Sequence, residues 1–142
     1  MIKYLVLRDT QEYAKVSYLS QEEVKWLWIT DYFDGPLEGM VEVAAEMFLC
    51  KFAEEVEEEA DENWFRKYWI IKLTPVQLDI EIYWHQEFCK YVGEHFVCNE
   101  DGTRKTSGPK HHRIEWDKFY KPYKRNYKPD FTNNEVIGWC QL

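Results

Sequence analysis

The sequence contains little glycine and proline and has no long apolar run. Its 142 residues include 6 Gly and 5 Pro, too few for a low-complexity or linker protein. A membrane-spanning helix needs a run of about 18 apolar residues, and none occurs. The first four residues also lack the apolar stretch and cleavage site of a signal peptide. We therefore expect a cytoplasmic protein that does not insert into a membrane.

Motifs that define a reaction are absent as well. There is no glycine-rich phosphate loop, no G-x-S-x-G and no H-E-x-x-H sequence. The 4 cysteines form no C-x-x-C pair, so in a reducing compartment we expect free thiols, most of them buried. No cofactor is expected.

Aromatic residues, in contrast, are abundant at 18%, enough to supply much of a core. At this length we expect one domain, 1–142. Its fold is predicted as α+β: a mostly antiparallel sheet of five to seven strands, one long packed helix at about 75–92, and an aromatic C-terminal segment. Runs of β-branched and aromatic residues predict strands at 2–8, 13–19, 40–44, 47–52, 64–73 and 135–142.

Local signals define several elements further. Ser20 and Glu23 have the spacing of a capping box, which predicts a short helical turn before an extended segment. Asp34-Gly35-Pro36 predicts a turn. The sequence around the long helix has an N-cap, an N1 proline, a capping-box glutamine and a C-terminal glycine: Thr74, Pro75, Gln77 and Gly93. This helix is apolar over most of its girth, so we expect it to be covered on two sides. A second, short helix is expected at 113–121, limited by Pro122.

Three segments resemble a family of small bacterial proteins without assigned activity. Residues 31–39 match D-Y-x-D-G-P-L-x-G, residues 73–78 match a helix opening L-T-P-x-Q-L, and residues 134–139 match N-E-x-x-G-W. The resemblance covers residues 30–142. It departs at Ala45-Glu46, where the relatives have a glycine-containing turn. It implies a single compact domain and no particular function.

Charge is strongly segregated along the chain. Residues 1–103 carry 22 acidic and 9 basic side chains, a net charge of −13, whereas residues 104–128 carry 9 basic and 2 acidic, a net of +7. Such asymmetry points to a partner or to an internal contact between the two regions.

The acidic residues are densest at 54–62, where seven of nine side chains are carboxylates. The favoured interpretation is a solvated loop between strands. A sharper one is a docking surface for a basic partner, formed by Glu54, Glu55, Glu57, Glu58, Glu59, Asp61 and Glu62. These residues can also screen the basic segment 104–128 within one molecule.

Two groups of side chains are weak candidates for catalysis. Asp31, Asp34 and Glu38 gather at the predicted turn, where three carboxylates suit a divalent cation or acid–base work, although turns also use such residues to satisfy their own backbone. Glu81 and His85 lie one helical turn apart, where the carboxylate can orient the imidazole. A structural pair is the favoured interpretation.

Metal and nucleic acid are the remaining alternatives. His95 and Cys98, followed by His111 and His112, are zinc-ligand types, but the usual second pair is missing. We therefore expect no metal. Residues 110–128 interleave basic and aromatic side chains, as single-strand binding requires, but the acidic pI of about 5.0 opposes it.

These observations favour a non-enzymatic acidic protein-binding domain, for example an immunity-type protein that neutralises a basic partner. The alternatives are a small enzyme that uses Asp31, Asp34 and Glu38 or Glu81 with His85, and a nucleic-acid module that uses 110–128. The sequence leaves an oligomer open.

Overall fold

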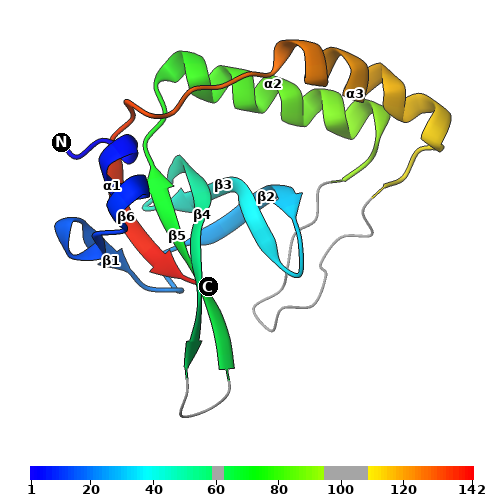
Figure 1. The fold of residues 1–142 in the computed structure, drawn as a ribbon. Coiled ribbons are helices and arrows are strands. Elements are labelled where there is room, and N and C mark those ends of the chain that lie inside the picture. The colour runs from blue at the N-terminus through cyan, green and yellow to red at the C-terminus, as the bar shows by residue number, and fades with distance from the viewer. Residues whose placement is uncertain (59–62, 95–108) are drawn as a thin grey trace. The chain divides into compact units, whose positions relative to one another are not determined.

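The computed structural model describes residues 1–58, 63–94 and 109–142 (Figure 1). These residues form two compact units, one made of residues 1–73 and 131–142 and the other of residues 74–130. The expected single domain, 1–142, stays a prediction.

The first unit is built on a sheet whose described residues form six strands, in the order β1-β6-β5-β4-β3-β2. All neighbours are antiparallel except β1 and β6, which are parallel. The α+β class and the mostly antiparallel sheet are therefore confirmed. The strands are β1 (Ser17–Leu19), β2 (Lys25–Tyr32), β3 (Pro36–Val43), β4 (Glu46–Glu58), β5 (Asn63–Ile71) and β6 (Val136–Gln141).

The two faces of the sheet bury different residues, because alternate side chains point in opposite directions. One face carries a core cluster that includes Val41, Cys50, Tyr68, Ile70 and Cys140. The side chains on the other face are also buried, among them Met40, Leu49, Trp69 and Ile71. Both faces of the central strands are thus withdrawn from water.

The N-terminal segment corrects the first strand prediction. Residues 2–8 were expected to be extended, but Tyr4–Thr10 form the helix α1. Tyr4 and Leu7 are buried, whereas Leu5 and Val6 are 40% and 47% exposed. That spacing is helical, because a strand would alternate its buried side chains. The predicted strand 13–19 likewise divides into a 3-10 helix, η1 (Tyr13–Lys15), and the short β1.

The predicted hairpin of 40–44 and 47–52 is confirmed by the pairing of β3 with β4. Its two turn residues, Ala44 and Ala45, have φ values of 50° and 65°. Such tight hairpin turns favour glycine or asparagine, so the turn is strained. The Ser20–Glu23 contact is also confirmed, since Glu23 Oε2 accepts from the Ser20 backbone N–H at 2.7 Å.

The acidic run is the second correction. Residues 54–58, expected to belong to a loop, are the end of β4 and pair in register with residues 63–67 of β5. Glu59, Asp61 and Glu62 lie outside the described residues. The cross-strand pairs Glu54↔Lys67 and Glu55↔Arg66 explain the difference, because they set basic side chains opposite two of the carboxylates.

The second unit is a pair of helices, α2 (Pro75–Tyr91) and α3 (Arg113–Asn126). The predicted capping box is confirmed: the Gln77 backbone N–H donates to Thr74 Oγ1, and the Thr74 N–H donates to Gln77 Oε1. Along the helices, Trp84 and Phe88 contact Phe119 through their rings, with centroids 6.1 and 5.3 Å apart.

Two expectations about the helices are wrong. The second helix does not stop before Pro122 but continues to Asn126. It is nearly as long as α2, so the unit does not contain one long helix alone. The two-sided burial of α2 also fails, because Val76, Ile80 and Tyr83 are 69%, 43% and 51% exposed. Within the described residues, no helix has the length and apolar character that crossing a bilayer requires.

Candidate protein-binding surface

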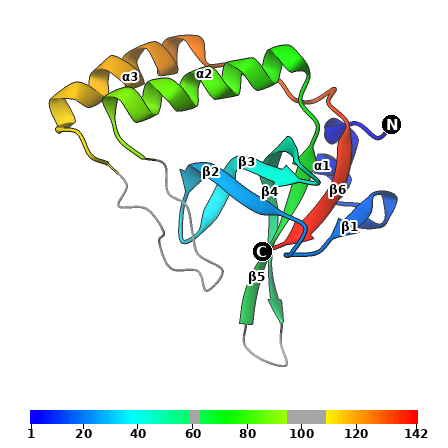
Figure 2. The same cartoon turned by 180° about the vertical axis from the view of Figure 1, so that it is seen from behind.

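The ends of β4 and β5 project beyond the rest of the sheet as a two-stranded ribbon, visible from both sides in Figures 1 and 2. We call the described residues 54–58 and 63–67 the arm. β3 pairs with β4 only as far as Lys51, and β6 pairs with β5 only from Lys67 onward. Over most of its length, the arm therefore has no further strand beside it among the described residues.

The projection begins at a β-bulge. The register of β4 against β5 shifts between Phe52 and Glu54, which leaves Ala53 as the extra residue. A bulge increases the local twist of a strand and bends it. It therefore separates the buried part of β4 from the arm.

The pairing register assigns the arm's side chains to two faces. Glu55 with Arg66, and Glu57 with Trp64, are opposite pairs that lie on the same face, because they are two residues apart. We call this the acidic face. Glu55 and Glu57 are exposed, and Trp64 is 61% exposed. An indole that extends from a strand into solvent, opposite the exposed carboxylate of Glu57, suits a cationic ligand.

The other face of the arm has a different environment. Here Lys67 points its ammonium over the ring of Tyr13, 4.4 Å from the centroid, and lies 5.2 Å from the centroid of Trp139. Lys67 Nζ also lies 3.8 Å from Glu54 Oε1. Burial, and then the neighbouring Glu54 carboxylate, raise the pKa of the Tyr13 phenol. On this face Lys67 is therefore already engaged by groups of the same unit.

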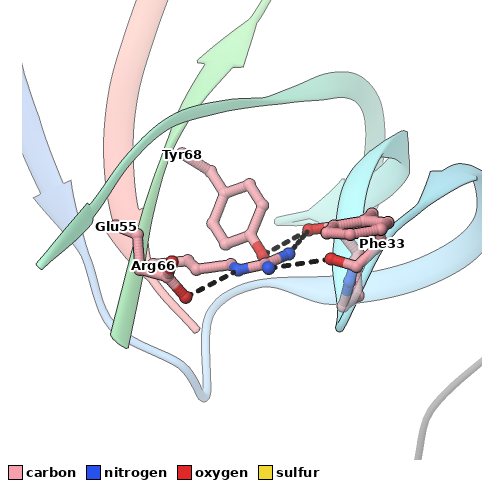
Figure 3. Close-up of polar contacts among 5 residues, drawn as sticks. Phe33, Glu55, Arg66 and Tyr68 are labelled. Atoms are coloured by element: carbon pink, nitrogen blue, oxygen red, sulfur yellow. Dashed lines mark hydrogen bonds and ion pairs between the residues drawn. The ribbon is translucent and has the colours of Figure 1, made fainter. Parts of the chain in front are cut away.

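Arg66 ties the acidic face to the turn at 33–36. Its Nη2 donates to the Phe33 carbonyl at 2.8 Å and its Nη1 to the Pro36 carbonyl at 3.3 Å (Figure 3). The Tyr68 hydroxyl donates to the same Pro36 carbonyl at 2.6 Å. The Arg66 Nε lies 3.5 Å from Glu55 Oε1. One guanidinium thus holds both the turn and a carboxylate of the arm.

The turn itself is closely fitted to Arg66. Gly35 has a φ of +134°, a conformation that favours glycine. A Cβ placed there would also lie only 3.2 Å from Arg66 Nη1, so the guanidinium would have to shift slightly. The turn leaves Phe33 72% exposed and Tyr32 43% exposed. Arg66, which lies on the same face of the arm as Trp64, thus binds the backbone of the turn that carries the exposed Phe33 ring. The first unit presents exposed aromatics together with carboxylates.

The three carboxylates predicted at the turn do not act together as a metal site. Glu38 Oε1 lies 3.2 Å from Lys51 Nζ, while Asp31 and Asp34 are exposed. Asp34 has a φ of 52°, a left-handed conformation that aspartate tolerates. Within the described parts of the chain, no three His, Cys, Asp or Glu side chains are arranged to hold a metal ion.

Glu81 and His85 lie in the second unit. Glu81 is 5% exposed, and its Oε1 accepts from the Tyr127 hydroxyl at 2.6 Å. Partial burial lowers the pKa of His85. Its ring nitrogens lie 3.9 Å from Cys89 Sγ, and burial raises the pKa of that thiol. The imidazole and the thiol are thus both biased toward their neutral forms.

Of the remaining candidates, His112 has a structural partner. His112 Nδ1 accepts from the Ile114 backbone N–H at the start of α3, and His95 and Cys98 lie outside the described residues. On α3 the rings of Phe119, Tyr123 and Tyr127 stack on one another, with centroids 5.0 and 4.6 Å apart. Three of the five aromatic rings in residues 110–128 are therefore packed against each other.

Sequence reasoning identified the carboxylates of the arm but missed Phe33, Trp64 and Arg66. The local signal for Trp64 was its position two residues after the acidic run 54–62. Arg66 carried no local signal, since the carbonyls that it binds, those of Phe33 and Pro36, lie 33 and 30 residues earlier.

Comparison with known proteins identifies no relative. No family model, no curated protein and no solved structure matches this chain. The resemblance to small bacterial proteins stays a prediction, and the function has to be argued from the surface itself.

Proposed function

We propose that this protein is a non-enzymatic binding module whose arm takes a basic protein partner, in the manner of an immunity-type protein that neutralises a basic toxin in the cytoplasm. The observation that carries the proposal is the acidic face: Glu57 and Trp64 form an opposite pair on a ribbon that projects from the sheet, and both are exposed. Neither side chain contributes to the core. Both side chains are therefore available to bind a partner.

The charge of the arm determines the chemistry of the partner. The arm carries four acidic and two basic side chains, and with residues 59–62 of the sequence the stretch 54–67 has a net charge of −5. Complementary charge speeds encounter and suppresses wrong partners. Aromatic residues are enriched at the centres of interfaces, and a lysine or arginine side chain can interact with both Trp64 and Glu57. A basic protein surface fits this arrangement best.

The experiment compares three forms of the protein against a partner captured from a lysate and then purified. The first is the unchanged chain, and the second carries Glu57→Lys with Trp64→Ala. The third is a matched control, Glu46→Lys, which changes an exposed carboxylate at the opposite end of the same strand. Affinity is measured by calorimetry at low and high salt.

We expect the arm variant to bind the purified partner at least about tenfold more weakly, a change of roughly 1.4 kcal/mol. The control should bind like the unchanged chain, and added salt should weaken binding in both. A partner that binds the arm variant and the unchanged chain equally well would show that the arm is not the binding surface.

A further inference from the structure

Along the arm, no described strand pairs with the outer edge of β4. β3 accompanies β4 only to Lys51, whereas β4 continues to Glu58 with β5 on one side. Along each strand of an antiparallel ribbon, every second residue turns its N–H and C=O away from the partner. Among the described residues, no strand accepts these groups between Glu54 and Glu58. This edge therefore offers backbone donors and acceptors to an added strand.

The open edge of β5 is shorter. The backbone N–H of Leu142 donates to the Arg66 carbonyl at 3.1 Å, so residues at the end of β6 already occupy the part of this edge nearest the sheet. On β4, the Gln11 side chain donates to the Ala53 carbonyl at 3.2 Å. That contact satisfies the bulge residue just before the arm begins. The longer open edge is that of β4.

Charge determines what can occupy this edge. A second copy of the chain would bring glutamates next to glutamates, and like charges on neighbouring strands destabilise pairing. Charged edge strands are a known protection against such self-association. A strand with lysine or arginine side chains has the complementary charge. The edge thus discourages a second copy and favours a basic segment.

We propose that an extended, basic segment of a partner protein adds to the edge of β4 at residues 54–58 as a further strand. This inference rests on the proposed function and specifies how the arm binds. Strand addition uses main-chain hydrogen bonds for affinity and alternate side chains for specificity. Glu55 and Glu57 lie on the acidic face. Val56 lies on the other face with Glu54, whose carboxylate already has Lys67 Nζ 3.8 Å away. The partner segment therefore alternates basic residues, beside Glu55 and Glu57, with apolar residues beside Val56.

The test uses synthetic peptides of about ten residues, a length that spans the arm. The first alternates Lys with Val, and the second has the same composition with all Lys residues before all Val residues. Two further peptides keep the alternating sequence but carry N-methyl groups on either the lysines or the valines. N-methylation removes the backbone donors on one edge of the bound peptide and leaves those on its other edge. Binding is measured by fluorescence anisotropy to the unchanged chain and to the variant with Glu57→Lys and Trp64→Ala.

Strand addition predicts that the alternating peptide binds about tenfold more tightly than the block peptide. It also predicts that one of the two methylated peptides loses about tenfold in affinity while the other stays within about threefold of the parent. If both methylated peptides bind as tightly as the parent, or the alternating peptide does not bind, strand addition is wrong.

The same experiment separates this inference from the proposed function. Suppose that N-methylation has no effect but the arm variant still binds the peptides at least about tenfold more weakly. The acidic face then binds basic segments through side chains alone, and only strand addition fails. If peptide affinity ignores both the methyl groups and the arm variant, the arm does not recognise basic segments, and both proposals are overturned.

Discussion

The same two strands, β4 and β5, have very different surroundings at their two ends. Within the sheet, Leu49, Cys50, Ile70 and Ile71 are at most 1% exposed. Past the bulge at Ala53, Glu55 and Glu57 are exposed and Trp64 is 61% exposed. The pairing between the strands continues throughout, so hydrogen bonding does not distinguish the ends. The two ends differ instead in their neighbouring strands and in how closely their side chains are packed.

This difference separates residues that stabilise the fold from residues that are available for binding. Isolated two-stranded ribbons are marginally stable in water, so the arm depends on its connection to the sheet. The arm itself adds little to the stability of the sheet, because it buries little apolar surface. Such a surface, which does not support the core, is expected where function requires it. The comparison therefore predicts large effects of substitutions in the sheet and small ones in the arm.

The largest expected effect is in the sheet. Ile70 is fully buried in the core cluster, so Ile70→Ala removes contacts and leaves a cavity. We expect it to reduce the free energy of unfolding by about 2–5 kcal/mol. Urea denaturation, followed by tryptophan fluorescence, measures the change. A loss below about 1 kcal/mol would show that the central strands are not the stable part of the unit.

An intermediate effect is expected at the junction between the sheet and the arm. Tyr68→Phe removes the hydroxyl that donates to the Pro36 carbonyl, a bond that contributes about 1 kcal/mol net. Tyr18→Phe is the matched control, because Tyr18 is 54% exposed. Urea denaturation near neutral pH should show the loss for Tyr68→Phe and almost none for Tyr18→Phe.

The same variant should also change how the stability of the protein depends on pH in alkaline solution. Burial raises the pKa of Tyr68, so above pH of about 10 the unfolded state loses this proton before the folded state does. The folded state then holds more protons, and stability falls as pH rises through that window. Tyr68→Phe should make the fall shallower, by up to about 1.4 kcal/mol per pH unit. A decline as steep as that of the unchanged chain would contradict the burial of this hydroxyl.

Elements with local signals could be predicted from the sequence, and those that depend on distant partners could not. The capping box of Thr74 with Gln77 and the turn at 34–36 each involve residues within three positions of one another. α1 was missed because Leu5 and Val6 suggest a strand, and only the contacts of the folded unit bury Tyr4 and Leu7 instead. Local sequence preference was overridden by packing.

The candidate surface shows the same division. The carboxylates of the arm were identified from their density alone. Their placement on a strand depends on pairing with Arg66 and Lys67, and self-repulsion among neighbouring glutamates indicated a loop instead. The role of Phe33 depends on its backbone contact with Arg66, which no local pattern reveals. Cross-strand neutralisation is the physical reason that an acidic run can remain extended and paired.

A smaller effect of opposite sign is expected at the other end of β4. Ala45 has a φ of 65° in the turn that joins β3 to β4, a conformation that glycine adopts without strain. Ala45→Gly should therefore stabilise the protein by about 0.5–1 kcal/mol, despite the greater freedom of glycine in the unfolded chain. Thermal unfolding measures the gain. A lower melting temperature would show that the alanine turn is unstrained.

The smallest effect on stability, and the sharpest test of the comparison, is in the arm. Trp64→Ala should change the free energy of unfolding by about 0.5 kcal/mol or less, because the indole is mostly exposed. Removing a buried tryptophan would cost about 3–5 kcal/mol. The two values are far enough apart for urea denaturation to distinguish them. A loss of more than about 2 kcal/mol would place the indole in a packed environment and remove the basis of the acidic face. A change within experimental error, together with weakened binding of a basic partner, would show that the arm serves recognition and contributes nothing measurable to the fold.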